Sequence, residues 1–178
     1  FIGPKSETID LMGNKANERE QMRLGGVPVI PGSEGFISDV EEAQKVALKV
    51  GYPVMLKAAA GGGGKGIRRV ATPDDLGKAF VEAQQEALGS FGDNRMYLEK
   101  IMENVKHIEV QIFRDQHGNA VFFPERDCSL QRNKQKMIEE SPCDLVSAKQ
   151  REFLGEISIK AANAIGYINT GTLEYLMD

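Results

Sequence analysis

A run of five glycines and one lysine at residues 61–66 (GGGGKG) constrains the fold of this chain more than any other feature. The flanking segments 53–58 (PVMLKA) and 67–70 (IRRV) have the composition of short β-strands. Because glycine has no Cβ, consecutive backbone N–H groups in such a loop can close around phosphate oxygens. Residues 57–70 include no acidic residue and four basic ones, Lys57, Lys65, Arg68 and Arg69. The sequence predicts a strand–loop–strand unit that binds an anion, and a flexible surface loop is the alternative.

Three known phosphate-binding loops can be compared with this run. Gly61, Gly63 and Gly66 satisfy the G-x-G-x-x-G pattern of dinucleotide-binding folds. That fold needs a helix directly after the loop, whereas residues 67–70 are typical of a strand. A P-loop is excluded because Ala59 and Gly66 stand where it needs Gly and Ser or Thr, and a protein kinase is excluded because no H-R-D motif is present. A glycine hairpin folded over a nucleotide remains.

Charge and hydropathy exclude two classes of partner. With 22 Lys and Arg against 26 Asp and Glu, the net charge of −4 would repel a nucleic-acid backbone. No apolar run approaches the roughly 18 to 20 residues of a membrane-spanning helix. Cys128 and Cys143 form no C-x-x-C pair or disulfide framework, so we expect a cytoplasmic protein. The chain begins at Phe1 without an initiator Met or signal sequence, and we expect it to be part of a longer protein.

Periodicity and capping signals predict a mixed α+β fold. Helices are expected at 14–24, 40–50, 73–88 and 148–165. Capping boxes, Ser38 with Glu41 and Ser147 with Gln150, are expected to begin the second and the fourth helix. A polar connection is expected at 126–135, and strands are expected at 53–58, 67–70, 96–100, 107–112, 120–125, 136–139 and 172–177.

Two regions carry basic candidates for an anion site. Lys57 ends an otherwise apolar strand, which buries its stem and directs its ammonium toward the glycine loop or, alternatively, out to solvent. Lys15, at the start of a helix, is by itself more typical of a surface charge. The basic segment 126–136, which includes Gln131, suits a small oxyanion better than a duplex, and a solvated loop is the alternative.

Polar residues on two predicted strands are further candidates. His107 shares a strand face with Glu109 and Gln111, but no matching His or Cys lies nearby to complete a metal site. Glu174 is expected to face inward, where a carboxylate has either a salt-bridge partner or a hard cation.

Five segments of the chain resemble those of a known family in their order and spacing. They are FIGPKSETIDLMGNK, KAAAGGGGKGIRRV, EKIMENVKHIEVQIF, ERDCSLQRNKQK and GTLEYLMD. In this order they resemble the central part of biotin carboxylases, which are ATP-grasp enzymes, and most closely the biotin carboxylase subunits of bacterial acetyl-CoA carboxylases. The similarity runs from Phe1 to Asp178 without a large gap.

The resemblance implies a set of nucleotide contacts. Lys15 and Lys57 would contact the phosphates of ATP. Gly63 and Gly64 would belong to a mobile lid over the nucleotide. The segment against adenine would be formed by Glu99, Lys100, Ile101 and Met102.

The resemblance also implies residues around the reacting groups. His107 and Gln131 would line the nucleotide site. Lys136 is similar to the family's lysine on the bicarbonate side. Glu174 is similar to the first of two acidic ligands for magnesium or manganese.

The activity implied is ATP-driven activation of bicarbonate to carboxyphosphate, followed by transfer of the carboxyl group to biotin on a carrier protein. The expected partners are bicarbonate, the biotin carboxyl carrier protein, carboxyltransferase subunits and a second copy of the full-length protein. The biotin carboxylase domain of a pyruvate or propionyl-CoA carboxylase, and a non-catalytic ATP-binding module, are alternatives.

The resemblance also gives an expected domain organisation. Residues 1–28 would be a helical lead-in from the preceding domain, 29–101 the lid subdomain and 102–178 part of the second ATP-grasp subdomain. Lys134 stands where many relatives carry His, and the second metal carboxylate would lie beyond Asp178. We therefore expect the 178-residue chain alone to be inactive.

Overall fold

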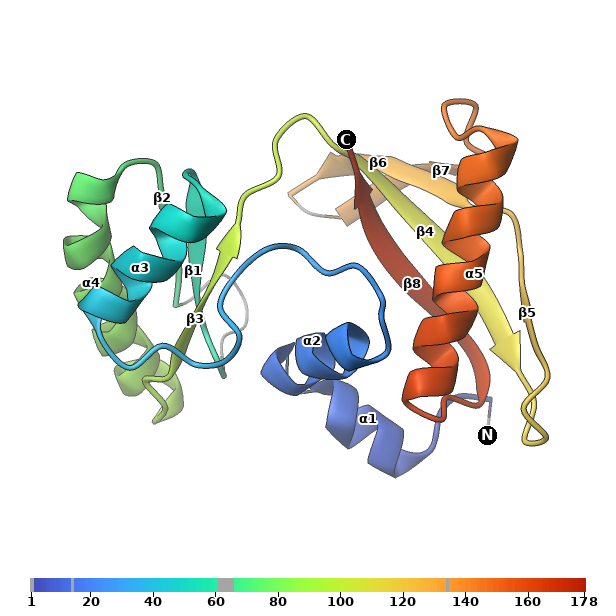
Figure 1. The fold of residues 1–178 in the computed structure, drawn as a ribbon, viewed down its shortest axis with the longest axis horizontal. Coiled ribbons are helices and arrows are strands. Elements are labelled where there is room, and N and C mark those ends of the chain that lie inside the picture. Colours follow the sequence, from blue (N-terminus) through green and yellow to red (C-terminus); the bar gives the residue numbers. More distant parts are fainter. Residues whose placement is uncertain (1, 14, 61–65, 134) are drawn as a thin grey trace. The chain divides into compact units, whose positions relative to one another are not determined.

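The chain folds into two compact units. The computed structural model describes residues 2–13, 15–60, 66–133 and 135–178, and their side chains outside 13–17. The small-sheet unit consists of Met12–Glu20 and Val29–Ile101, and the large-sheet unit consists of Phe1–Leu11, Gln21–Pro28 and Met102–Asp178. Each unit has its own sheet and its own apolar core (Figure 1).

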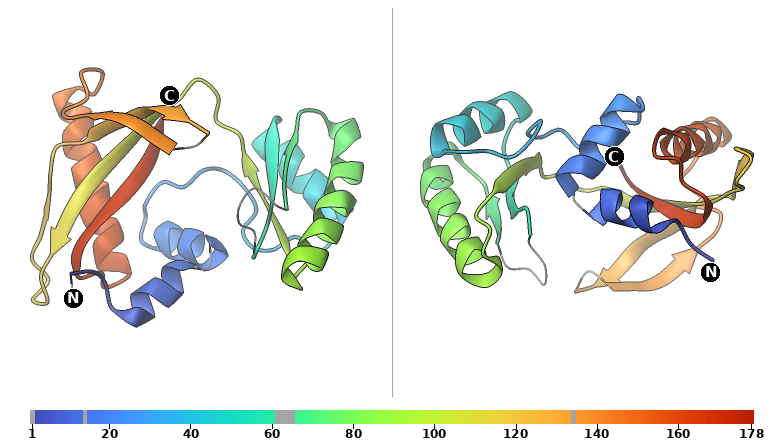
Figure 2. Two further views of the ribbon diagram at one scale, coloured as in Figure 1. Left: turned by 180° about the vertical axis from the view of Figure 1, so that it is seen from behind. Right: turned by 90° about the horizontal axis from the view of Figure 1, so that it is seen from below.

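The small-sheet unit has three antiparallel strands in the order β2-β1-β3, with two helices packed on one face (Figures 1 and 2). Val54 pairs with Val70 on one side and with Lys100 on the other, which fixes the register of the predicted glycine hairpin. Leu56, Phe80 and Leu98 lie in the core between sheet and helices. The elements are α3 (Val40–Val50), β1 (Val54–Ala58), β2 (Ile67–Val70), α4 (Pro73–Phe91) and β3 (Met96–Lys100).

The large-sheet unit is built around a long central strand. One edge of β4 pairs along its whole length with β8, and β5 and β6 also pair with β4, with β7 beyond β6. The elements are β4 (Lys106–Arg114), β5 (Ala120–Phe122), β6 (Arg126–Arg132), β7 (Gln135–Glu140), α5 (Ala148–Ala164) and β8 (Asn169–Met177). Two short helices precede them in the chain, α1 (Ser6–Gly13) and α2 (Lys15–Leu24).

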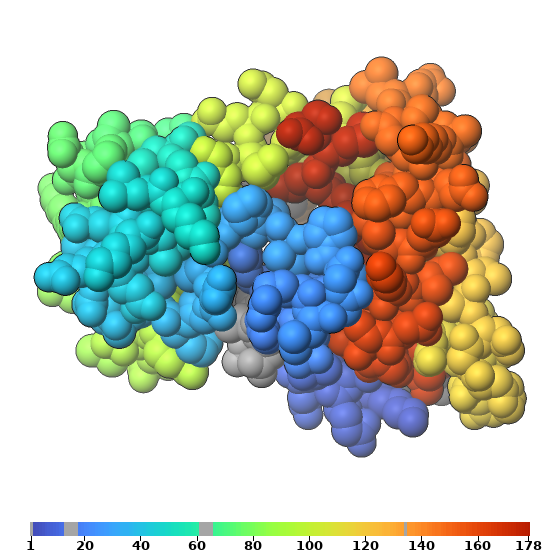
Figure 3. All heavy atoms as spheres, viewed as in Figure 1, coloured from blue at the N-terminus to red at the C-terminus, as the bar shows by residue number. Residues whose placement is uncertain are grey.

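Alternation along β4 separates the two faces of this sheet. Ile108, Val110 and Ile112 are buried against α5, as the period-two pattern predicts. In the space-filling view the atoms of α5, in orange, lie on the surface of this unit (Figure 3). The predicted capping box at Ser147 and Gln150 is confirmed. No helix among the described residues is both long and apolar enough to span a bilayer.

Three local predictions are wrong. Helix α3 is capped by Asp39, whose carboxylate accepts from the N–H of Glu42, while Glu42 Oε2 accepts from the N–H of Ser38, so the predicted Ser38–Glu41 box is not the cap. Residues 126–132 form strand β6 instead of a polar connection. Register shifts between Asp127 and Gln131 interrupt the alternation there, which conceals the strand in the sequence. Helix α4 continues three residues past 88, to Phe91, and ends at a left-handed Gly92.

Candidate functional site

In the small-sheet unit, two cations share one buried carboxylate. Lys57 on β1 and Glu99 on β3 lie on neighbouring strands, diagonal to each other in the register. The ammonium of Lys57 donates to Glu99 Oε2, and Arg19 Nη1 donates to Glu99 Oε1 at 2.8 Å. Arg19 also donates to the carbonyl of Ile30 at 2.8 Å. Lys57 Nζ lies 5.9 Å from the centroid of the Tyr97 ring, which is within range of a cation–π contact. We call Arg19, Lys57 and Glu99 the Glu99 triad.

The Glu99 triad carries a net positive charge. Burial acts to raise the pKa of Glu99, but hydrogen bonds from Lys57 and Arg19 outweigh burial and hold that pKa below its ordinary value. Glu99 is therefore ionised at neutral pH, and the two cations and one anion sum to +1. Burial, with the charge of Glu99, raises the pKa of Tyr97, whose phenol stays neutral. A surplus positive charge at a partly buried lysine suits an anionic ligand.

The far end of the glycine loop is fixed by its neighbours. Gly66 has φ +67°, and a Cβ there would lie 2.6 Å from the Cβ of Ala58, so no other residue fits this approach. The N–H of Gly66 and the guanidinium of Arg68 both bond Glu86 at 2.9 Å. The predicted lid residues Gly63 and Gly64 lie outside the described residues.

The predicted adenine segment is held by backbone contacts. Lys100 N donates to Pro31 O at 2.8 Å, and Ile101 N to Pro53 O at 3.0 Å. The ammonium of Lys100 donates to the carbonyls of Gly51 and Tyr52 at 2.9 and 2.7 Å. The side chain of Lys100 therefore positions the turn before β1. Met102 follows Ile101 and is half-buried.

In the large-sheet unit, two carboxylates face each other across neighbouring strands. Glu109 on β4 is paired in register with Glu174 on β8, and like charges in that position repel. Lys136 reaches across from β7 and relieves the repulsion, donating to Glu109 and to Glu174 Oε1, the latter at 2.6 Å. Arg126 on β6 also bonds Glu109 and lies 3.7 Å from Glu139 Oε2. We call Arg126, Lys136, Glu109, Glu139 and Glu174 the Glu109 cluster.

The Glu109 cluster carries the opposite surplus charge. Burial acts to raise the pKa of Glu109, but hydrogen bonds from Lys136 and Arg126 lower it below its ordinary value. The same bonds to Glu109 and Glu174 raise the pKa of Lys136. Two cations and three carboxylates sum to −1.

The orientation predicted for Glu174 is wrong. Its side chain is 66 % exposed, because alternation along β8 directs Leu173 and Tyr175 into the core with α5. The salt bridge to Lys136 is the partner that the sequence left open. Glu174 offers oxygen ligands at the open face of the sheet, where a hard cation can reach them.

The remaining predicted residues take no part in the Glu99 triad or the ion pairs of the Glu109 cluster that the structure describes. His107 lies on the same face of β4 as Glu109, and its backbone N–H donates to Ser129 Oγ at 3.0 Å. Gln131 lies opposite Lys136 in the β6–β7 register and donates to Cys128 O at 2.9 Å. The side chain of Lys15 and residue Lys134 lie outside the described residues.

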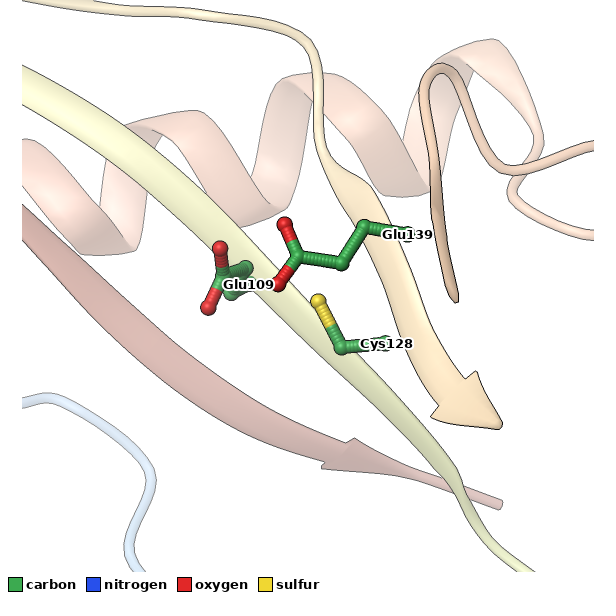
Figure 4. A group of neighbouring side chains, drawn as sticks. All are labelled: Glu109, Cys128 and Glu139. Carbon is green, nitrogen blue, oxygen red and sulfur yellow. The ribbon is translucent and has the colours of Figure 1, made fainter. Parts of the chain in front are cut away.

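The ligand atoms of a third group are spaced as in a metal site, but its side chains are not available as metal ligands. Potential ligand atoms of Glu109, Cys128 and Glu139 lie within 4.8 Å of one another (Figure 4). Burial, with a smaller effect of Glu109, raises the pKa of Cys128 to about 11, so its thiol stays protonated. Both carboxylates are already paired with Arg126. We therefore assign this group to the ion pairing of the Glu109 cluster.

Two arginines in these sites had no signal in the sequence. Arg19 sits in a polar helix, and the basic segment that contains Arg126 did not single that residue out. Both become visible only once the strands bring Glu99 and Glu109 beside them.

Comparison with known proteins decides the family. Residues 14–178 match the family model of the carbamoyl-phosphate synthase L chain, ATP binding domain. The chain belongs to this family. It is 52 % identical to a biotin carboxylase of Halalkalibacterium halodurans, covering 39 % of that protein, and 48 % identical to the 2-oxoglutarate carboxylase small subunit of Hydrogenobacter thermophilus, covering 38 %.

A solved structure agrees with these relatives. The crystal structure of a biotin carboxylase–β,γ-ATP complex from Campylobacter jejuni matches with a TM-score of 0.90 and 52 % identity, over all of this chain and 40 % of that one. The predicted resemblance to biotin carboxylases and the predicted α+β ATP-grasp fold are thereby confirmed. The chain spans about two-fifths of the length of these relatives.

Proposed function

We propose that this chain is the ATP-binding part of an ATP-dependent ligase, a biotin carboxylase. The parent protein would use MgATP to activate bicarbonate as carboxyphosphate and would then carboxylate biotin on a carrier protein. The observation that carries the proposal is the pair of lysines, Lys57 and Lys136, each held by a buried glutamate that also binds an arginine, in clusters of opposite net charge. Phosphoryl transfer needs both kinds of site, because its catalysis is mainly positioning and charge neutralisation.

On the phosphate side, Lys57 would contact ATP, either by breaking its bond to Glu99 or while keeping that bond. Its half-buried stem fixes the direction of approach, while its ammonium remains a compact charge. Lys15, Gly63 and Gly64 are proposed to act with it, and residues 99–102 to lie against adenine. His107 and Gln131, both in the large-sheet unit, are proposed to line the nucleotide site, as the family resemblance implies.

On the bicarbonate side, Lys136 would hold the small anion. Its pKa is raised by two carboxylates, so its ammonium stays charged while it neutralises developing charge on the substrate. Glu109 would orient this ammonium from within the sheet.

The open face near Glu174 fits magnesium or manganese. Both ions prefer oxygen ligands, and the carboxylates of Glu174 and Glu109 supply them in a cluster of net −1. When bound, the ion would neutralise phosphate charge. Glu174 would hold the ion from the open face of the sheet, and Glu109 would keep Lys136 in place for bicarbonate.

The final acceptor of the carboxyl group is proposed to be acetyl-CoA, so that carboxylation of biotin by the parent protein would be the first half-reaction of acetyl-CoA carboxylase in fatty-acid synthesis. A keto-acid carboxylase is the second candidate. It is favoured by the 2-oxoglutarate carboxylase small subunit and by the biotin carboxylase subunit of a pyruvate carboxylase, each 48 % identical. Comparison of acyl-CoA with keto-acid carboxylation by the full-length protein separates the two.

The partners are proposed by analogy with the relatives. One solved 2-oxoglutarate carboxylase domain is a dimer in complex with MgADP, ADP and bicarbonate, which supports a homodimer of the full-length protein. Biotin carboxyl carrier protein and carboxyltransferase subunits would complete the reaction. Some relatives are chloroplastic, and a cytoplasmic location is our proposal for this chain.

The first test is calorimetric titration of the chain with MgATP. We expect saturable binding that Lys57→Ala weakens at least tenfold, since one charge-assisted contact is lost. Lys78→Ala is the matched control, because Lys78 is an exposed lysine on α4 whose partner is Glu82. Equal binding by the Lys57→Ala variant would contradict the phosphate assignment.

The second test uses the full-length protein. We expect ATP hydrolysis that depends on bicarbonate and is abolished by Lys136→Ala. Hydrolysis that proceeds without bicarbonate would overturn the proposed reaction.

A further inference from the structure

The small-sheet unit contains an arginine to which the proposed reaction gives no role. Arg19 lies on α2, its side chain is 18 % exposed, and it donates hydrogen bonds to Glu99 on β3 and to the carbonyl of Ile30. It occupies Oε1 of Glu99, while Lys57 occupies Oε2. The two cations therefore do not compete for one oxygen, and either can stay when the other leaves.

We infer that Arg19 is a positioning residue: it keeps Glu99 compensated when Lys57 moves from this carboxylate to a phosphate of ATP. The inference rests on the proposed function. Glu99 is only 11 % exposed, and a buried carboxylate without a cation is costly. Without Arg19, each departure of Lys57 would leave such a carboxylate behind, and Lys57 would be held in place.

The geometry distinguishes the two cations as fixed and movable. Arg19 has a second anchor at Ile30 O, and its planar guanidinium holds both bonds at 2.8 Å. The segment around it is closely packed, since a Cβ on Gly32 would lie 2.3 Å from Leu98 O and 3.0 Å from Arg19 Nη2. Lys57 has a flexible stem and is more exposed, at 27 %.

A purely structural clamp is the competing explanation. A clamp would stabilise the fold and would affect every ligand of the unit to the same degree. If Arg19 instead compensates Glu99 when Lys57 leaves, its loss weakens only the ligands that draw Lys57 away from Glu99. The two explanations therefore differ in the titration of Glu99 and in the dependence of binding on phosphate.

The first experiment measures the pKa of the Glu99 carboxyl by NMR in the full chain and needs no nucleotide. Lys57 and Arg19 act on Glu99, with neutral Tyr97 beside them, and the carboxylate of Glu18 acts on Tyr97. In Lys57→Met we expect the pKa to stay below its ordinary value, because Arg19 remains. In the Arg19→Met, Lys57→Met double variant we expect it to rise above that value, and Arg19→Lys should keep it low. A rise in Lys57→Met alone would overturn the inference.

The second experiment compares the affinities of MgATP and adenosine by calorimetry. We expect Arg19→Met to weaken MgATP about tenfold to a hundredfold and to change adenosine less than about twofold, with Arg19→Lys near wild type. Because Glu99 must take up a proton when Lys57 leaves this variant, its extra loss should grow from pH 6 to pH 8. An equal loss for both ligands would establish the clamp instead.

The outcomes separate the inference from the proposed function. If the wild-type chain binds neither ligand, the proposed nucleotide site fails for this chain, and the NMR titration still decides whether Arg19 alone compensates Glu99. Lys78→Met is the control for a lost surface cation in the same unit.

Discussion

The Glu99 triad and the Glu109 cluster share one design but have opposite charge. In each, a buried glutamate bonds one lysine and one arginine. Glu99 lies on β3, next to β1, and Glu109 lies on the central strand β4. The difference is made by two further carboxylates, Glu139 and Glu174, which lie only beside Glu109. The buried glutamate and its two cations therefore set the geometry of each site, while the more exposed carboxylates set its net charge.

A third buried glutamate provides the strongest test of this comparison. Glu125 is 1 % exposed and bonds Arg151 through both oxygens at 2.7 Å, and it also accepts from the N–H of Cys143. Arg151→Met leaves this carboxylate buried without a cation, and we expect the free energy of unfolding to fall by about 3 kcal/mol in urea denaturation. MgATP affinity of the folded variant should not change. A loss below about 1 kcal/mol would mean that Glu125 is compensated by the backbone.

The next largest effect is expected in the Glu109 cluster. Lys136→Met leaves Glu109 and Glu174 directly opposed, and we expect a loss of about 2 kcal/mol in urea denaturation, less than for Arg151 because Glu174 is exposed and Arg126 remains. The Lys136→Met, Glu174→Gln double variant should recover about half of that loss. No recovery would show that repulsion across the strand pair is not the cause.

Acid unfolding compares the units through two aspartates. Both Asp127, beside Lys106 and Ser129, and Asp93, beside Arg95, have a pKa lowered to about 2. For Asp127 burial acts in the opposite direction and is outweighed by these hydrogen bonds, whereas for Asp93 the hydrogen bonds from Arg95 are the largest cause. Because both folded pKa values lie below the unfolded value, stabilisation is present above about pH 4 and is lost as the pH falls toward 2.

We therefore expect Asp127→Asn to flatten the stability profile between pH 4 and pH 2, by about 1 kcal/mol after screening. The measurement is urea denaturation across that range. Asp93→Asn should flatten it less, because its partner Arg95 is exposed. A larger effect at Asp93 would reverse the expected order of the units.

The smallest effect is expected in the Glu99 triad. Lys57→Met leaves Glu99 paired with Arg19, so we expect a loss of stability below about 1 kcal/mol in urea denaturation. A loss equal to that of Lys136→Met would remove the distinction between a compensated and an opposed carboxylate.

Local patterns predicted much of this fold. The alternation in residues 107–112 identified the buried face of β4, and the two apolar segments around the glycines identified the β1–β2 pair. Strand β6 was missed, because its register shifts interrupt the pattern, and the direction of Glu174 was missed, because two faces of a strand are equivalent until a helix covers one.

The site was predictable only in part. Lys57, Lys136 and Glu174 could be named from motifs, but their partners Glu99 and Glu109 became informative only through pairing between distant strands. Arg19, 80 residues from Glu99, lies beyond any local pattern.

The register that sets Glu109 opposite Glu174 has a further consequence for folding. Lys136 bonds both carboxylates in the structure, and the strength of the β4–β8 pairing therefore depends on the positive charge beside them. Any added cation that binds there stabilises the native state by mass action and raises the melting temperature of the large-sheet unit with its concentration. Cation binding and the stability of the large-sheet unit are thus coupled, and the melting temperature reports how far the cation site is occupied.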